Sequence, residues 1–252
     1  MTTPTQPIAA AILVAMDIEA QPFLDSPLVS ASSHLDLRAG TAAQAWRLHV
    51  TSQDTHRSVV LLRTGIGLVN SAAGLAAVLR ELDPELVISA GTAGGLMRGI
   101  AVGDVCVSTT LAYTDADATA FGYVRGQIPG MPATFGSDDA ARALLREVGP
   151  AALVGATPSS TDAQLHEGQM LAGNSFVTQS NVSDTRLAFP EAVSTDMEST
   201  AMAQVCHNRE LPFIAVRGVS DLCGPEAGED FHIGAEEAAA RSAAVVLSLL
   251  AA

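Results

Sequence analysis

Short apolar runs alternate with longer amphipathic or alanine-rich stretches along most of the chain. Each short run is predominantly apolar and does not alternate with polar residues, which is typical of a strand that is buried on both faces of a sheet. Runs of this kind span residues 9–16, 59–63, 86–90, 105–108, 193–195 and 213–217. The stretches 68–82, 199–208 and 235–250 have the apolar spacing that predicts helices.

Strands that alternate with helices indicate βαβ crossovers, and neither a linker nor a repeat interrupts this order. We therefore predict one α/β domain over residues 1–252, with a central mixed, largely parallel twisted sheet flanked by helices. Residues 111–190 are less regular. In this region we expect loops around Pro129–Pro132 and at Thr157–Asp162.

Carboxylates and glycine-rich segments follow several of the predicted strands. In open α/β sheets, ligands bind beyond the carboxyl ends of the strands, so these segments are expected to meet in one cleft. Acids that meet in a cleft repel one another, which raises some of their pKa values and provides proton donors near neutral pH. The candidates are Asp17 and Glu19, Thr64–Gly67, Gly91–Gly95, Asp196 and Glu198, and Arg217, Ser220 and Asp221.

Each candidate also has a purely structural explanation. Glu19 and Glu198 would suit the first turn of a helix, where a carboxylate interacts favourably with the helix dipole. Asp221 would suit a helix cap or a turn. The segment Gly91–Gly95 lacks the G-x-G-x-x-G spacing of a dinucleotide site and would suit a tight turn. The common placement of these residues at strand ends nevertheless favours a shared cleft.

A pair of carboxylates on either side of a scissile bond is the equipment for transferring a glycosyl group to water. One acid activates the nucleophile and the other protonates the leaving group. Arg217, Thr92 and Ser220 supply a cation and hydroxyl groups that can hold the water or orient a carboxylate. A serine hydrolase is disfavoured, because the chain has no G-x-S-x-G motif.

Composition narrows the choice of ligand. The chain has 27 acidic and 13 basic residues, a net charge of −14, and every basic residue is arginine. Without lysine, neither a P-loop nor a Schiff-base mechanism is possible. The negative charge argues against nucleic acid or an anionic membrane as a partner. We expect a small, near-neutral or cationic ligand.

Cysteine usage and apolar segments bear on location and cofactors. Cys106, Cys206 and Cys223 are odd in number and far apart, which suits free thiols in the cytoplasm. The apolar stretches 9–16 and 243–252 are too short to cross a bilayer. Neither Cys206 nor its neighbour His207 has a second ligand at metal-binding spacing. We expect no metal and no cofactor.

Seven short segments, taken in order and spacing, resemble the 5′-methylthioadenosine/S-adenosylhomocysteine nucleosidases of the nucleoside phosphorylase superfamily over nearly the full length of the chain. The segments are Ala15–Glu19, Thr64–Gly67, Gly91–Leu96, Asp115–Tyr123, Gly126–Gly130, Asp196–Glu198 and Val216–Asp221. The resemblance implies a nucleoside phosphorylase-like fold and cleavage of an N-glycosidic bond.

The resemblance also implies roles for the catalytic residues. Glu19 corresponds to the base that takes a proton from the attacking water, and Thr92 and Arg217 correspond to the residues that hold that water and the base. Asp221 corresponds to the acid that protonates adenine N7, supported by Ser220. An oxocarbenium-like transition state is cationic, so a cleft rich in carboxylates would favour it.

The remaining correspondences concern substrate binding. Glu198 matches the carboxylate that grips the ribose hydroxyls, and Met197 the residue beneath the sugar. Phe176 and Val177 match the pair that stacks on adenine and reads its edge. The 5′-thioalkyl pocket would be formed by Met16, Ile66 and Phe231, with Phe121 and Pro129 supplied by the other subunit of a homodimer.

Hydrolysis is favoured over phosphorolysis, because Asp17 and Glu19 stand where a phosphorylase would need a phosphate-binding turn. The resemblance therefore implies a hydrolase that acts on methylthioadenosine and S-adenosylhomocysteine. Three alternatives stay open: a nucleosidase of the aminodeoxyfutalosine type, a purine nucleoside phosphorylase, and a non-catalytic nucleoside-binding relative. The presence of Glu19, Glu198 and Asp221 together argues against the last.

Overall fold

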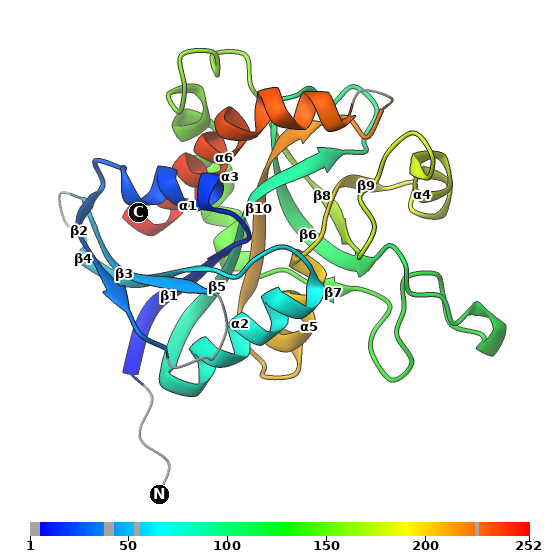
Figure 1. The fold of residues 1–252 in the computed structure, drawn as a ribbon, viewed down its shortest axis with the longest axis horizontal. Coiled ribbons are helices and arrows are strands. Elements are labelled where there is room, and N and C mark those ends of the chain that lie inside the picture. The colour runs from blue at the N-terminus through cyan, green and yellow to red at the C-terminus, as the bar shows by residue number, and fades with distance from the viewer. Residues whose placement is uncertain (1–5, 38–42, 53–55, 225–226) are drawn as a thin grey trace, which may run out of the picture.

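The computed structural model describes residues 6–37, 43–52, 56–224 and 227–252, and for residues 227–233 only the backbone. It confirms the predicted α/β architecture with a mixed sheet flanked by helices (Figure 1). The strands are β1 (Gln6–Val14), β2 (Val29–Leu35), β3 (Gln44–Thr51), β4 (His56–Arg63), β5 (Leu82–Gly95), β6 (Val105–Tyr113), β7 (Phe135–Gly136), β8 (Leu165–Ala172), β9 (Ala192–Asp196) and β10 (Phe213–Asp221). The helices are α1 (Asp17–Leu24), α2 (Leu68–Glu81), α3 (Asp139–Val154), α4 (Val182–Ala188), α5 (Ser199–His207) and α6 (Ala227–Ala251), with a 3₁₀ turn at Thr119–Phe121.

Parallel pairings form the centre of the sheet. Strand β1 lies between β4 and β5, and β5 also pairs with β10, all in parallel. Beyond β4, β3 and β2 continue the sheet as antiparallel strands. On the other side, β10, β6, β8 and β9 pair in succession and β9 returns to β5, so that these five strands close into a ring.

Helices cover both faces of the sheet. On one face, α1, α3 and α6 pack through residues such as Phe23, Leu145 and Val245, and on the other α2 and α5 pack through Leu75 and Met202 (Figure 1). Since β1 and its neighbours are buried on both faces, their continuous apolar sequences are explained. None of the helices in the described part of the chain combines the length and apolar character needed to cross a bilayer.

Two strands run further than the sequence predicted. The glycine-rich segment Gly91–Gly95, expected as a turn, is the last part of β5, and Gly218 lies within β10. Glycine is required there because neighbouring groups approach closely: a Cβ on Gly218 would lie 2.0 Å from the carbonyl oxygen of Ala238 in α6. The apolar pattern ends before these strands do, so the pattern alone places their glycines at strand exits.

The region 111–190 holds more regular structure than its sequence pattern indicated. It contains α3, β8 and α4 in addition to the loops expected near Pro129–Pro132 and Thr157–Asp162. Asp138 caps the N-terminus of helix α3 by accepting a hydrogen bond from the Ala141 N–H, but the helix carries Pro150 in its interior. Strand β8 is only half-buried over its first five positions. These features weakened the periodic signal.

Candidate active site

A cavity of about 240 Å³ opens at the carboxyl ends of β1, β5, β9 and β10. This is the edge of the sheet at which the sequence placed the cleft. The cavity combines a floor of buried polar side chains with apolar walls. It is lined by Ala15, Met16, Glu19, Ile66, Thr92, Ala93, Gly94, Ser175, Phe176, Val177, Thr195, Asp196, Met197, Glu198, Ser220, Asp221 and Cys223.

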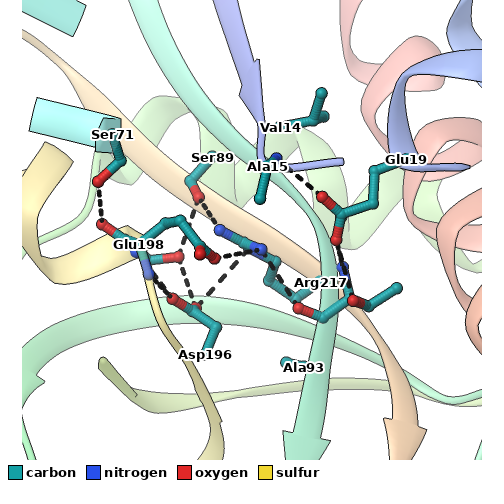
Figure 2. A network of polar contacts seen from close by, with 12 residues as sticks. Val14, Ala15, Glu19, Ser71, Ser89, Ala93, Asp196, Glu198 and Arg217 are labelled. Atoms are coloured by element: carbon teal, nitrogen blue, oxygen red, sulfur yellow. Dashed lines mark hydrogen bonds and ion pairs between the residues drawn. The ribbon is translucent and has the colours of Figure 1, made fainter. Parts of the chain in front are cut away.

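Glu19 lies in the first turn of α1 and its side chain is buried, with 1% of the residue exposed. Its Oε2 accepts hydrogen bonds from the backbone N–H groups of Ala15 (2.8 Å) and Met16 (3.1 Å). Its Oε1 accepts from the N–H (2.7 Å) and the hydroxyl (2.9 Å) of Thr92 (Figure 2). Gly91 makes room for this carboxylate, because a Cβ there would lie 2.4 Å from Oε1. Glu19 therefore does lie in the first turn of a helix, as its structural explanation expects, but its carboxylate is buried and hydrogen-bonded and not solvated.

Arg217 lies in β10 beneath the cavity and is also 1% exposed. Its Nη2 donates to Ser89 Oγ (2.7 Å), and its Nη1 donates to the Thr92 carbonyl oxygen (3.2 Å) and to Glu198 Oε2 (3.3 Å). Its Nε lies 3.7 Å from Asp196 Oδ2. Two buried carboxylates thus share the charge of one guanidinium, as Figure 2 shows.

Glu198 directly precedes α5, and its Oε1 accepts a hydrogen bond from the Gly67 N–H at 2.9 Å. Burial raises the pKa of Glu198 to about 7; the Arg217 guanidinium opposes this shift, whereas the neighbouring Asp196 and Glu19 carboxylates add to it. Glu198 therefore changes its charge near neutral pH, in the middle of the cavity floor.

Asp221 is the last residue of β10 and lines the same cavity. Its Oδ2 accepts from the Ser220 hydroxyl (3.0 Å) and its Oδ1 from the Cys223 N–H (2.9 Å). The pairing with β5 skips Ser220, and such a bulge redirects the side chains that follow it. Gly94 leaves room for the side chains of Asp221 and Cys223, because a Cβ at position 94 would lie 2.5 Å from Cys223 Sγ and 3.1 Å from Asp221 Oδ1. The expected turn role of Asp221 coexists with its place in the cavity.

The cavity walls are apolar and partly open. Val177 is buried, whereas Phe176 is 45% and Ile66 is 52% exposed. Met16 and Met197 are half-buried. Within the described residues, no group of three or more His, Cys, Asp or Glu side chains is placed to hold a metal ion. The arrangement suits an uncharged ligand with flat or thioether groups at the walls and a reacting centre over the carboxylates.

The sequence matches the family described as the phosphorylase superfamily over residues 9–251. It is 39% identical over 196 residues to the 5′-methylthioadenosine/S-adenosylhomocysteine nucleosidase of Actinobacillus succinogenes, which covers 77% of this chain and 81% of that protein. The chain belongs to the phosphorylase superfamily, among its 5′-methylthioadenosine/S-adenosylhomocysteine nucleosidases.

Solved structures of these nucleosidases are similar over almost the whole chain. The enzyme from Neisseria meningitidis, in complex with methylthio-immucillin-A, has a TM-score of 0.85 and 32% identity, with 96% of this chain and 98% of that chain covered. The enzyme from Colwellia psychrerythraea, in complex with adenine, has a TM-score of 0.84 and 30% identity, with 98% and 96% covered.

Two residues that the nucleosidase resemblance assigned to substrate binding, Phe121 and Pro129, do not line this cavity. Phe121 and Pro129 lie in the arm formed by residues 114–131, which projects from the body of the molecule as the green segment after β6 (Figure 1). Phe121 is 83% exposed. The side chain of Phe231 lies outside the described residues. The roles of all three stay predictions.

Sequence reasoning missed several residues that hold the nucleosidase site together. Asp196 was noted only as an acid at a strand end, and no role was given to Ser89, Ser199 or the Gly67 N–H. Ser89 and Ser199 are fully buried, and Ser89 is the one polar residue in the apolar run 86–90. A single buried hydroxyl in a central strand was the available signal, since it must find a hydrogen-bond partner.

Proposed function

We propose that this chain hydrolyses the N-glycosidic bond of 5′-methylthioadenosine and S-adenosylhomocysteine, releasing adenine and the 5-thioribose product. The observation that carries the proposal is the convergence of three acids on one cavity: Glu19 from α1, Glu198 from the start of α5 and Asp221 from the end of β10. Relatives that carry this name match the chain over most of its length.

Glu19 acts as the general base. Its carboxylate is held by four donors that leave it facing the cavity, and Thr92 contributes two of them. A water bound beside Glu19 and Thr92 gives one proton to the carboxylate while its oxygen bonds to the anomeric carbon of the ribose. Arg217 fixes the Thr92 carbonyl from below and so helps to keep the base and the water in place.

Asp221, in its protonated form, acts as the general acid. It gives its proton to adenine N7 as the bond between the anomeric carbon and N9 breaks, so that adenine leaves as a neutral molecule. Ser220 holds one oxygen of the acid and the Cys223 N–H holds the other. Phe176 stacks on the base, and Val177 offers its backbone to the edge of the ring.

Glu198 binds the ribose hydroxyls, with Met197 beneath the sugar. As the glycosidic bond lengthens, positive charge develops on the ribose ring, and the carboxylates of the floor favour this charge more than the neutral ground state. Met16 and Ile66 form an apolar wall that suits a 5′-thioether.

Hydrolysis is preferred to phosphorolysis on electrostatic grounds. A phosphate nucleophile needs a cation free to bind it, but Arg217 already lies against Asp196 and Glu198. Glu19 would also repel phosphate at the position of the nucleophile.

The direct test is to incubate the protein with methylthioadenosine, with and without phosphate, and to follow adenine and free methylthioribose. We expect equal rates in both; a ribose 1-phosphate product would overturn hydrolysis. Asp221→Asn should lower kcat by about a thousandfold while the thermal unfolding transition is retained. Near-wild-type turnover would remove Asp221 as the acid. Futalosine-type nucleosides and 5′-deoxyadenosine in the same assay rank the substrates.

We further propose that the enzyme works as a homodimer in the cytoplasm, with Phe121 and Pro129 of the partner subunit closing the thioether side of each pocket. Two features support this assembly: the exposed Phe121 on its arm, and an apolar groove between α2 and α5 where Val69 is 78% exposed. Sedimentation equilibrium should give twice the chain mass, and Phe121→Ala should raise KM for methylthioadenosine. A fully active monomer would contradict the assembly.

A further inference from the structure

A chain of hydrogen bonds connects Arg217 with Asp196 through two serines beneath the cavity floor. Arg217 Nη2 donates to Ser89 Oγ (2.7 Å), Ser89 Oγ lies 2.9 Å from Ser199 Oγ, and the Ser199 hydroxyl donates to Asp196 Oδ2 (2.6 Å). All four side chains are buried. We call this set the serine relay.

The direction of every bond in the serine relay follows from the donors available. Ser199 has one hydroxyl hydrogen, and it is used on Asp196. In the contact between the serines, Ser89 must therefore be the donor. The oxygen of Ser89 in turn accepts from the guanidinium. The relay thus runs one way, from the cation of Arg217 to the acceptor Oδ2 of Asp196.

Asp196 has a second task at the start of α5. Its Oδ1 accepts hydrogen bonds from the N–H groups of Glu198 and Ser199, both at 2.8 Å. Asp196 thereby fixes the backbone of Glu198 as well as the counter-charge of Arg217. Its two oxygens are engaged by three hydrogen bonds and one ion pair, so it is held rigidly.

The placement of Asp196 affects Glu198 through the charges on the cavity floor. Among the residues that the structure describes, the floor holds one cation, Arg217, near the three carboxylates of Asp196, Glu198 and Glu19. If Asp196 is the fixed partner of Arg217, the single 3.3 Å contact between Arg217 and Glu198 leaves Glu198 with hydrogen-bonding capacity for a ligand. Without the Asp196 carboxylate, the positive charge of Arg217 would interact mainly with Glu198.

We infer that Asp196 is a positioning residue, which neutralises Arg217 through the serine relay and so keeps Glu198 available to the ribose hydroxyls. This inference rests on the proposed function, in which Glu198 binds the sugar. The described groups that face Glu198 come from each element packed against it: Arg217 from β10, Asp196 from β9, Glu19 from α1, the Gly67 N–H before α2, and Ser71, whose hydroxyl donates to the Glu198 carbonyl oxygen (3.4 Å).

The test is Asp196→Asn, with kcat and KM measured for methylthioadenosine from pH 5 to 9. Asparagine keeps an oxygen for the two N–H groups of α5 but removes the charge. We expect KM to rise about tenfold with a much smaller change in kcat. The acidic limb of the kcat/KM profile should move down by about one pH unit, because Glu198 loses a like charge and faces Arg217 alone.

Asp138→Asn is a matched control. The Asp138 carboxylate likewise accepts from a backbone N–H at the start of a helix, α3, but it forms no ion pair with an arginine among the described residues and does not line the cavity. This variant should leave KM and the pH profile unchanged. An unmoved acidic limb in Asp196→Asn, or a loss of kcat alone, would assign Asp196 a structural role and overturn the inference.

If Asp196→Asn shows no cooperative thermal transition, Ser89→Ala carries the test, since it breaks the serine relay and retains every charge. It should raise KM about threefold, and an unchanged KM would overturn the inference. The proposed function can fail separately: if the wild-type protein releases no adenine, the titration of Glu198 in both proteins, followed by carboxyl ¹³C NMR, still measures whether Asp196 shifts it.

Discussion

The carboxylates of Glu19 and Glu198 lie in the same cavity and are buried to nearly the same extent, 1% and 4% exposed, yet they are held by different means. Glu19 accepts four hydrogen bonds from uncharged donors. Glu198 accepts one from the Gly67 N–H and one from the Arg217 guanidinium, which it shares with Asp196.

The two carboxylates therefore depend on different properties of the site: Glu19 on the position of its donors, and Glu198 on the charges around it. Three backbone N–H groups and the Thr92 hydroxyl fix where the Glu19 carboxylate points, as a base that must meet one water requires. Glu198 depends on the balance of neighbouring charges, and that balance, with burial, raises its pKa to about 7. The Glu19 side is thus sensitive to geometry, and the Glu198 side to charge.

The largest effect is expected for Glu19→Gln. The carboxamide cannot take a proton from water, and its NH₂ group would face donors on Ala15 and Met16 or on Thr92. We expect kcat to fall by about a thousandfold, with KM changed far less, in an adenine-release assay. Asp17→Asn is the control on the same helix, because Asp17 is exposed and pairs only with Arg63 among its described contacts. Equal losses in both variants would show a general effect on α1.

A smaller effect, acting through geometry alone, is expected for Gly91→Ala. The new Cβ would displace Glu19 Oε1, and residue 91 has a φ of +125°. We expect kcat to fall by about a hundredfold and the free energy of unfolding by about 2 kcal/mol. Gly99→Ala is the matched control, since Gly99 also has a positive φ but its Cβ would meet open space. It should lose stability and keep kcat; if both variants lose kcat equally, the fit of Glu19 against Gly91 is not what matters.

The smallest effect on catalysis is expected for Glu198→Gln, which removes charge and keeps shape. We expect kcat/KM to fall about thirtyfold, mainly through KM, and the acidic limb near pH 7 to disappear. Whereas kcat/KM falls in Glu198→Gln, the free energy of unfolding of this variant should rise. The folded pKa of about 7 lies above the ordinary 4.5, so wild-type stability falls as pH rises between these values. At pH 8 the variant should be more stable by on the order of 1 kcal/mol in denaturant titrations. Equal stability at pH 8 would contradict the charge argument.

The sequence alone was sufficient for the parts of the fold and site that depend on pattern. Continuous apolar runs located the central strands, and the rule that ligands bind at strand ends selected Glu19, Thr92, Glu198 and Asp221, all of which line one cavity. The family resemblance supplied the apolar wall, including Met16, which the residues alone did not indicate.

The parts that escaped prediction depend on distant contacts. Strand β8 and helix α3 have mixed burial, which leaves no clean period to detect. The serine relay joins Ser89 and Ser199, which are 110 residues apart, and the local sequence around either serine does not indicate that the two are in contact. The function of Gly91 is visible only when Glu19 is placed against it.

The position of β5 in the chain also affects folding during synthesis on the ribosome. One edge of β5 pairs with β1, which is already synthesised, but its other edge pairs through Val87–Ala93 with β10, which begins at Phe213. About 120 residues separate the end of β5 from β10, so at ordinary translation speeds that edge waits on the order of ten seconds. During this interval the nascent chain exposes an apolar strand to its neighbours, which makes slow translation a hazard and early chaperone capture an advantage.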